Sequence, residues 1–350
     1  MDAKRSSIGA ELLAWYDAHG RVLPWRARPG ETADPYRVWL SEVMLQQTTV
    51  AAVRPRFENW VARWPDVASL AAADEGEVMA AWAGLGYYAR ARNLVKAARA
   101  VVDDHRGAFP TTEAELRALP GLGAYTAAAV AAIAFGERAV VVDANVERVV
   151  ARLFAIDAPL PGARGAIRAA ADSITPTLRA GDFAQAMMDL GATICSPKRP
   201  RCLLCPLREE CRGFAEGEPE RLPVKAKKKA RPARFGTVFW LEGDGPGMTG
   251  SVWLVRRPPK GLLGGMRALP TGSWSEEPPL LADAPAATDW RVLPVTVAHG
   301  FTHFDLTLSL AIGRGTPQGE GEWWPVADVE SAGLPTLFAK AVRAILESDR

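Results

Sequence analysis

The chain has 350 residues, of which 48% are hydrophobic and 23% charged, which excludes a disordered or fibrous protein and leaves room for two hydrophobic cores. A net charge of +2 does not by itself indicate binding to a polyanion. The start of the chain lacks the apolar stretch of a signal peptide, and the longest apolar run, residues 127–135, is too short to span a bilayer. We therefore expect a cytoplasmic protein without a membrane partner.

Residues 8–211 predict one helix after another, separated by glycine and proline. The clearest helix start is Asp34-Pro35, an N-cap residue followed by proline at the first helical position. The helix that follows is apolar almost all round, as a buried helix is, and it carries Glu42. A carboxylate in such a place needs either a structural partner, such as an arginine or a helix end, or a chemical task. Burial favours its protonated form, which a general acid requires.

Further helices are expected over 50–63, 74–83, 88–104, 113–118, 124–135, 144–155, 164–178 and 182–194. The turn before the alanine-rich helix contains Gly121 and Gly123, which allow close backbone approach, and the helix N-terminus after it offers unpaired N–H groups to a phosphate. The same turn also suits any tight helix–helix connection. Asp143 stands between an apolar run and the next helix, where an N-cap role is the commonest one.

All four cysteines, Cys195, Cys202, Cys205 and Cys211, lie close together with the spacing C-x6-C-x2-C-x5-C. Two disulfides would suit a small secreted protein, which this chain is not expected to be. Four thiolates so close in sequence therefore predict a metal centre. Zinc and a four-iron cluster both use four cysteines, and the spacing alone does not separate them.

Residues 212–234 carry eight Lys and Arg against three Glu and predict a basic linker or, less commonly, a phosphate-binding strip. Beyond them the periodicity changes to two, most clearly over 305–312, with shorter strand-like runs at 235–241 and 252–255 and a final helix at 334–347. The sequence thus predicts a helical domain over 1–211 and a smaller α+β domain over 235–350.

The cysteine spacing, with Pro206 after the third cysteine, resembles the iron–sulfur cluster loop of the endonuclease III superfamily of DNA glycosylases. This resemblance implies a 4Fe–4S cluster at the loop 195–211 and contact of residues 197–201 with the DNA backbone. Residues 119–135, followed by Asp143, resemble the helix-hairpin-helix of the same enzymes, in which the aspartate faces the sugar. The implied fold is a mainly α helix-hairpin-helix glycosylase domain.

Residues 41–48 (SEVMLQQT) and 84–94 (GLGYYARARNL) resemble signatures of the adenine DNA glycosylases, the MutY family. The family implies a monomeric, nucleoid-associated enzyme of base excision repair that removes adenine paired with 8-oxoguanine or guanine in double-stranded DNA. By the same resemblance, Glu42 protonates the adenine, Asp143 stabilises the sugar cation and helps deliver water, and Tyr125 and Asn145 support the two carboxylates.

Tyr125 also separates two kinds of glycosylase. Bifunctional relatives carry a lysine at this position, which attacks the sugar and leads to strand cleavage, and a phenol cannot form that Schiff base. A tyrosine at position 125 therefore favours an enzyme that removes the base without cleaving the strand. The competing readings are a pyrimidine-damage glycosylase and lyase of the endonuclease III type, and a non-catalytic protein that binds damaged DNA.

The resemblance also implies how the mismatch is recognised, because the adenine must leave the base stack to reach Glu42. Two of the residues concerned, Trp25 and Tyr87, could equally serve ordinary packing in a hydrophobic core. The implied adenine pocket consists of Trp25, Arg26, Leu45 and Gln185, and the residues implied beside the lesion are Gln47 and Tyr87 as wedges with Thr48 and Leu85 near the oxidised base.

In the C-terminal part, Phe301-Thr302-His303 stands where the family usually has Phe-Ser-His, which implies contact with 8-oxoguanine. His299 and His303 have no evident third partner for a metal site. The region resembles the Nudix fold without its catalytic box, since Glu276-Glu277 lack the preceding Arg-Glu. We therefore interpret it as a recognition domain and not as a second enzyme.

Overall fold

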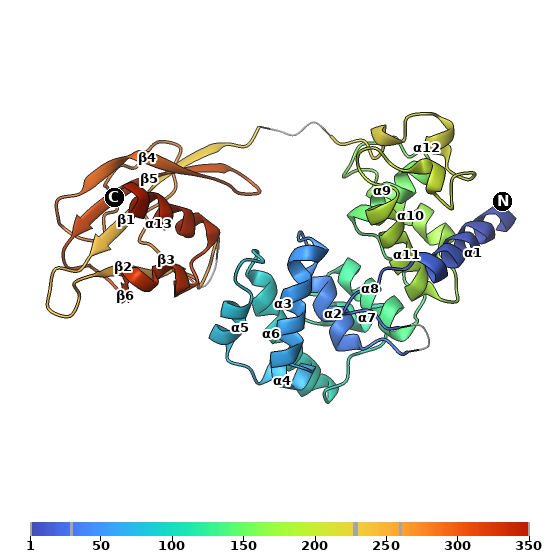
Figure 1. The fold of residues 1–350 in the computed structure, drawn as a ribbon, viewed down its shortest axis with the longest axis horizontal. Coiled ribbons are helices and arrows are strands. Elements are labelled where there is room, and N and C mark those ends of the chain that lie inside the picture. The colour runs from blue at the N-terminus through green and yellow to red at the C-terminus, as the bar shows by residue number, and fades with distance from the viewer. Residues whose placement is uncertain (1, 29–30, 227–229, 259–260, 349–350) are drawn as a thin grey trace. The chain divides into compact units, whose positions relative to one another are not determined.

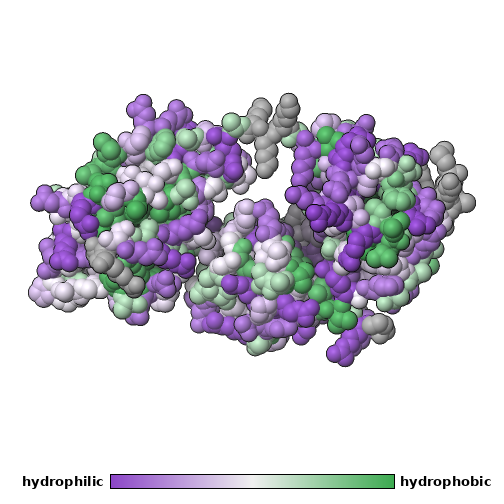
Figure 2. Space-filling view, turned by 45° about the horizontal axis from the view of Figure 1, so that its top comes forward, coloured by the Kyte–Doolittle hydropathy of each residue, from purple (hydrophilic) through white to green (hydrophobic). Residues whose placement is uncertain are grey.

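The computed structural model describes residues 2–28, 31–226, 230–258 and 261–348. The chain forms two compact units. The first contains residues 1–81 and 89–227, and residues 82–88 group with the second. The second contains the C-terminal 120 or so residues, and each unit is described by itself below (Figure 1). On the face shown in Figure 2, hydrophilic residues predominate and hydrophobic residues form separate patches.

The first unit is helical, as the sequence predicts. Its helices are α1 (Asp2–His19), α2 (Pro35–Met44), α3 (Val50–Arg63), α4 (Val67–Ala71), α5 (Glu75–Ala81), α6 (Ala89–His105), α7 (Glu113–Ala118), α8 (Ala124–Phe135), α9 (Ala144–Leu153), α10 (Arg164–Ile174), α11 (Ala180–Thr193) and α12 (Arg212–Ala215), with 3-10 turns η1 (Cys202–Leu204) and η2 (Pro219–Arg221). The helix expected to reach residue 178 ends at Ile174, because Thr175 precedes a proline and takes an extended conformation.

Helices α2 and α8 form the buried centre that positions the site. The Asp34 side chain accepts hydrogen bonds from the backbone N–H of Tyr36 and Arg37, with Pro35 at the first helical position, so the predicted start of α2 is confirmed. Helix α8 is apolar on nearly every face and packs against both α2 and α11. This packing places side chains 83 residues apart in sequence beside one another.

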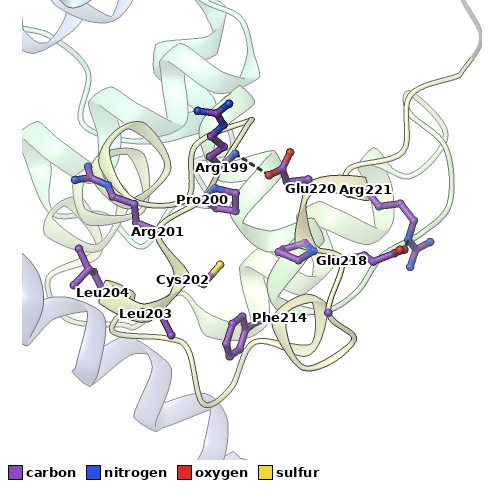
Figure 3. Close-up of a pocket in the computed structure, with 12 residues that line it drawn as sticks. Arg199, Pro200, Arg201, Cys202, Leu203, Leu204, Phe214, Glu218, Glu220 and Arg221 are labelled. Carbon is purple, nitrogen blue, oxygen red and sulfur yellow. Dashed lines mark hydrogen bonds and ion pairs between the residues drawn. The ribbon is translucent and has the colours of Figure 1, made fainter.

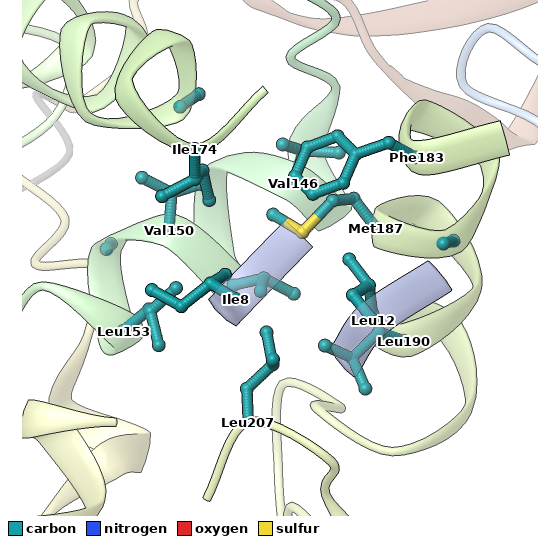
Figure 4. Packing of buried hydrophobic residues seen from close by; sticks show 14 of the residues in the cluster. Ile8, Leu12, Val146, Val150, Leu153, Ile174, Phe183, Met187, Leu190 and Leu207 are labelled. Carbon is teal, nitrogen blue, oxygen red and sulfur yellow. The ribbon is translucent and has the colours of Figure 1, made fainter. Parts of the chain in front are cut away.

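A second hydrophobic core brings together the start and the end of the helical unit's sequence (Figure 4). Ile8 and Leu12 of α1 pack among side chains of α9, α10 and α11, and Leu207 of the cysteine-rich loop closes the same cluster. Burying a leucine or isoleucine side chain of this kind contributes about 2 kcal/mol. The N-terminal helix therefore holds the cysteine-rich loop against α9 and α11, the helices that carry other candidate site residues.

Part of the segment predicted as a basic linker packs on the helical unit. Residues 212–226 form α12 and η2 and then pair with residue 160, where Leu160 donates its N–H to the carbonyl of Val224. Buried Arg152 donates to the carbonyl of Leu222 in the same stretch. The lysine run 227–229 of the predicted linker lies outside the described residues.

The second unit is a sheet covered by one helix (Figure 1). The strand order is β3-β2-β1-β5-β4, with β6 paired to β2; β1 and β5 run parallel and the other pairs are antiparallel. The elements are β1 (Ala233–Glu242), β2 (Ser251–Arg256), β3 (Arg267–Ala268), β4 (Arg291–Gly300), β5 (Asp305–Arg314), β6 (Glu322–Pro325), the 3-10 turn η3 (Val326–Ala332) and α13 (Thr336–Ser348).

Strand β4 is the longest strand that sequence reasoning missed; β3, β6 and the short helix α4 were missed as well. Strand β4 contains Pro294, which cannot donate to a ladder and argues against a central strand. The structure accommodates the proline because β4 is an edge strand and its register with β5 shifts between Val292 and Thr296. Among the described residues, no helix is long and apolar enough to cross a membrane.

Candidate active site

Glu42 lies on the buried face of α2 and faces Tyr125 at the start of α8. Its side chain is almost fully buried, and its Oε2 accepts a 2.5 Å hydrogen bond from the Tyr125 hydroxyl. Burial raises the pKa of Glu42 to about 7; nearby Asp143 adds to the rise, while the Tyr125 hydrogen bond and Arg26 oppose it. This carboxyl group can therefore hold a proton near neutral pH, which an exposed glutamate cannot do.

Asp143 is the N-cap of α9, and both of its oxygens have partners. Its Oδ1 accepts from the backbone N–H of Val146 at 2.7 Å, and its Oδ2 accepts from the side-chain amide of Asn145 at 2.9 Å. Desolvation raises the pKa of Asp143, and these hydrogen bonds, together with Arg148, act against that rise. The two carboxyl groups thus have different surroundings, which is the usual way to keep one protonated and the other ionised.

A pocket opens beside Glu42, and it contains the four residues predicted to surround the adenine. Trp25 also stacks edge-on against Phe57 and is buried, so it serves the core and the pocket together. The residues that line the pocket are Arg21, Leu23, Trp25, Arg26, Val38, Ser41, Glu42, Leu45, Val50, Ile133, Gln185 and Met188. Sequence reasoning missed Arg21 and Met188, whose only signal is a position within a few residues of Arg26 and Gln185.

The four cysteines line one small cavity together with Arg152 and Phe214. Within the described part of the chain, no three His, Cys, Asp or Glu side chains converge closely enough to hold a single metal ion. Four thiols around a shared cavity are the donor set that either zinc or a four-iron cluster uses. Arg152 donates to the Cys195 Sγ at 3.3 Å, and such a hydrogen bond stabilises a thiolate ligand.

A wider cavity of about 960 Å³ is lined by residues 199–204 of the cysteine-rich loop and by residues 214 and 217–221, and Glu42 is not among its lining residues (Figure 3). Leu203 and Leu204 are largely exposed at its edge, and Arg199 and Glu220 are joined by a backbone-to-carboxylate hydrogen bond of 2.8 Å. Its lining lacks a buried carboxyl group, so the smaller pocket at Glu42 is the better candidate for catalysis.

One arginine connects the cysteine-rich loop with Asp143. Arg148 donates to the carbonyl of Cys195 at 2.7 Å, to the carbonyl of Gly191 at 2.7 Å and to the side-chain oxygen of Asn145 at 3.0 Å. Asn145 in turn donates to Asp143. The position of the Asp143 carboxylate is therefore determined in part by the conformation of the cysteine-rich loop.

The predicted hairpin forms the turn before α8. Gly121 has a φ of 78°, and a Cβ there would lie 2.5 Å from the Cβ of Asn93, so only glycine fits. Gly123 is the N-cap of α8 and makes no side-chain capping bond, which leaves the first N–H groups of this 12-residue helix available.

The residues predicted beside the lesion occupy two turns, which belong to different units. Gln47, in the turn that follows α2, is exposed with a φ of 56°, and Thr48 donates its hydroxyl to the carbonyl of Gln46. Tyr87 has a φ of 49° and is 55% exposed, whereas Leu85 is buried. A left-handed backbone at Gln47 and Tyr87 is a strained conformation of the kind found at functional sites.

Phe301, Thr302 and His303 form the turn between β4 and β5, closed by a 2.9 Å hydrogen bond from the Phe301 N–H to the carbonyl of Phe304. Thr302 and His303 are exposed at its tip. Phe301 packs on Trp274 with ring centroids 5.4 Å apart, and Arg231 donates to the Phe301 carbonyl at 2.7 Å. The ring packing on Trp274 and the hydrogen bond from Arg231 thus hold this turn in place.

Comparison with known proteins decides the family. A human adenine DNA glycosylase is 35% identical to this chain, and the match covers 97% of this chain and 74% of the human protein. The chain belongs to the adenine DNA glycosylase family. A relative from Mycolicibacterium smegmatis is 43% identical over 60% of this chain and 70% of its own length.

Family models and solved structures agree with this assignment. Residues 40–171 match the HhH-GPD superfamily of base excision DNA repair proteins, and residues 247–344 match the NUDIX domain. A thermostable thymine-DNA glycosylase is 29% identical with a TM-score of 0.55, covering 61% of this chain and 98% of that one. Endonuclease III in a complex with DNA, at 24% identity and a TM-score of 0.52 over 62% of this chain and 98% of its own, shows the fold alone. The predicted fold class, a helix-hairpin-helix glycosylase domain with a Nudix-like α+β domain, is confirmed.

Proposed function

We propose that this adenine DNA glycosylase hydrolyses the N-glycosidic bond of adenine paired with 8-oxoguanine or guanine in double-stranded DNA. The observation that carries the proposal is the buried Glu42 carboxyl group, with a pKa near 7, in a pocket lined by Trp25, Arg26 and Gln185. A protonated acid facing a mainly apolar pocket suits a flipped base that must be protonated before it can leave. One chain carries all of these groups, so we propose that the monomer is active.

In this mechanism the Glu42 carboxyl group gives its proton to N7 of the adenine. The bond between N9 and the sugar C1′ then breaks, and its electron pair stays on the base. The Asp143 carboxylate stabilises the positive charge that develops on the sugar, and a water molecule adds to C1′ and loses its proton to Asp143. Tyr125 keeps Glu42 in place through its 2.5 Å hydrogen bond, and Asn145 does the same for Asp143.

We further propose that the enzyme removes the base without cutting the strand. The Tyr125 hydroxyl is engaged with Glu42, and burial and the nearby carboxylates raise the pKa of Tyr125 well above its usual value, so it stays a neutral phenol. No lysine is among the described residues that line the pocket. A Schiff base with the sugar therefore has no donor amine at this place.

A panel of duplexes tests the substrate. Under single-turnover conditions we expect excision, read as strand cleavage after hot alkali, when adenine is paired with 8-oxoguanine or guanine. Much slower excision is expected for A:T, and none for T opposite 8-oxoguanine. Preferential loss of an oxidised pyrimidine from the panel would instead support a glycosylase of the endonuclease III type.

The turn at Phe301 is proposed to contact the 8-oxoguanine. His303 offers two ring nitrogens and Thr302 a hydroxyl at the exposed tip, while Phe301 and its packing on Trp274 hold the turn in place. Replacing His303 with Ala is expected to weaken binding to an A:8-oxoguanine duplex about tenfold, the effect of one lost hydrogen bond to a polar partner, and to leave A:G binding nearly unchanged. Thr302→Ser, which keeps the hydroxyl, is the matched control. Equal weakening on both duplexes would contradict lesion recognition by this turn.

We propose that the four cysteines hold a 4Fe–4S cluster. When bound, the cluster supplies four iron–thiolate bonds that tie the loop together, and Arg148 passes that constraint on to Asn145 and Asp143. The purified protein is expected to contain about four iron and four sulfide ions per chain. One zinc ion and no sulfide would overturn this assignment.

The loop residues 197–201 and the hairpin at Gly121 and Gly123 are proposed to contact the phosphate backbone.

A further inference from the structure

Asp189 lies on α11. Among the described residues it is the only carboxylate that is completely buried and paired with two arginines. Its side chain has an exposed fraction of 0%, and both oxygens accept hydrogen bonds. Oδ2 accepts from the Arg21 backbone N–H at 2.9 Å and from Arg26 Nη1 at 2.7 Å; Oδ1 accepts from Arg21 Nε at 2.6 Å and Arg26 Nη2 at 2.7 Å. Buried, multiply bonded ion pairs of this kind fix geometry strongly, because breaking one leaves an uncompensated buried charge.

Both arginines belong to the wall of the pocket that contains Glu42. The Arg26 side chain is 9% exposed, and its guanidinium lies over the ring of Tyr16, 5.9 Å from the centroid. Gln185, one helical turn before Asp189 on α11, lines the same pocket. Asp189 therefore stands behind the pocket wall and holds two of its members, although it does not line the pocket itself.

The charges around Glu42 come from four elements. Tyr125 faces it from α8, Asp143 from the start of α9, and Arg26 from the segment before α2, with Asp189 of α11 behind that arginine. Arg26 lowers the pKa of Glu42, which opposes the effect of burial. Two guanidinium groups share the single Asp189 carboxylate, so this part of the wall has a formal charge of +1, and it would have +2 without Asp189.

We propose that Asp189 is a positioning residue for the reaction: it fixes Arg21 and Arg26 in the wall of the adenine pocket and offsets their positive charge beside the proton donor Glu42. The proposal rests on the proposed role of Glu42. Loss of the Asp189 charge leaves the arginines uncompensated, and the added positive charge favours the ionised form of Glu42, which cannot donate a proton.

The test is the pH dependence of the single-turnover excision rate for Asp189→Asn, which keeps the size and shape of the side chain. We expect the fall of the rate at high pH to begin about one pH unit lower than in the unchanged enzyme, because one uncompensated charge nearby shifts a buried group by about that much. At pH 8 the rate is expected to drop about tenfold, and below pH 6 most of the difference should disappear. Asp182→Asn is the matched control: it lies on the same helix and pairs with Arg179 at 2.7 Å, but outside the pocket.

A second variant separates charge from shape. In Arg21→Met/Asp189→Asn the wall has a formal charge of +1 again, so the high-pH fall should return toward its original position even if the rate stays lower; this variant also carries the test if the single variant does not fold. A rate that is reduced equally at every pH in both variants would overturn the proposal and leave Asp189 a purely structural role. If instead the unchanged enzyme shows no high-pH fall, or Glu42→Gln stays active, the proposed role of Glu42 has failed, which is a distinguishable result.

Discussion

Replacing Glu42 with Gln is expected to lower the single-turnover rate of adenine excision by about a thousandfold or more, within the range that general acid catalysis contributes. Glutamine fills the same space and its oxygen accepts the Tyr125 hydrogen bond, but the amide has no acidic proton to give. In the unchanged enzyme the rate should fall as the pH rises above about 7, since burial raises the pKa of Glu42 to about 7 and only the protonated carboxyl group can donate a proton. The residual rate of the variant should not show that fall.

Two controls separate this result from a folding defect. Glu147→Gln changes a glutamate of α9 that pairs with Arg164 at 3.0 Å, and it should leave excision unchanged. The raised pKa also means that ionised Glu42 destabilises the fold, so the stability linked to its proton is lost as the pH rises through 7. At pH 8, Glu42→Gln is therefore expected to unfold at a temperature no lower than the unchanged protein. A variant that is well folded and still excises adenine at a normal rate would remove Glu42 from the mechanism.

Replacing Asp143 with Asn is expected to lower the excision rate by about a hundredfold to a thousandfold, which is the typical effect of removing one group that stabilises a developing charge. The substitution keeps an oxygen for the Val146 N–H, so α9 should keep its cap, but it removes the negative charge that we propose stabilises the sugar cation. Affinity for an uncleaved A:8-oxoguanine duplex should change by less than about threefold, because this charge acts mainly on the transition state.

The capping role of Asp143 needs its own control. Asp66→Asn alters the N-cap of α4, whose side chain accepts from the Ser69 N–H at 2.8 Å, and reports the cost of a cap substitution away from the site. Dissociation constants from titration of labelled duplex and rates from single turnovers would be compared across both variants. Parallel loss of binding and excision in Asp143→Asn would assign the residue to DNA docking and not to catalysis.

How far the sequence predicts this site depends on whether a residue has a local signal. Glu42 stands out because a carboxylate within an apolar helix is costly, and Asp143 because it follows an apolar run at a helix start. The four cysteines stand out because their close spacing in sequence predicts a metal centre. Trp25 and Gln185 were found only through the family resemblance, since nothing in their neighbourhood marks them, and the structure places both in the pocket with Glu42.

Residues that act through long-range contacts were not predicted. Asp189 is separated from Arg26 by 163 residues and from Arg21 by 168, and an aspartate in the last half of a helix has no pattern that indicates its partners. Arg148, which joins the cysteine-rich loop to Asn145, looks in sequence like any arginine of an amphipathic helix. Strand β4 was missed for a local reason: it contains Pro294, and a proline argues against a strand unless that strand lies at the edge of a sheet.

Base removal by acid catalysis without strand cleavage is tested most directly by one experiment. A duplex with a single A:8-oxoguanine pair is mixed with excess enzyme, and free adenine and strand breaks are measured in the same samples before any alkali is added. We predict that adenine is released up to one per duplex while the strand stays intact, and that the strand breaks at that position once alkali is added. Strand breaks that keep pace with adenine release, or no free adenine despite tight binding, would contradict the claim.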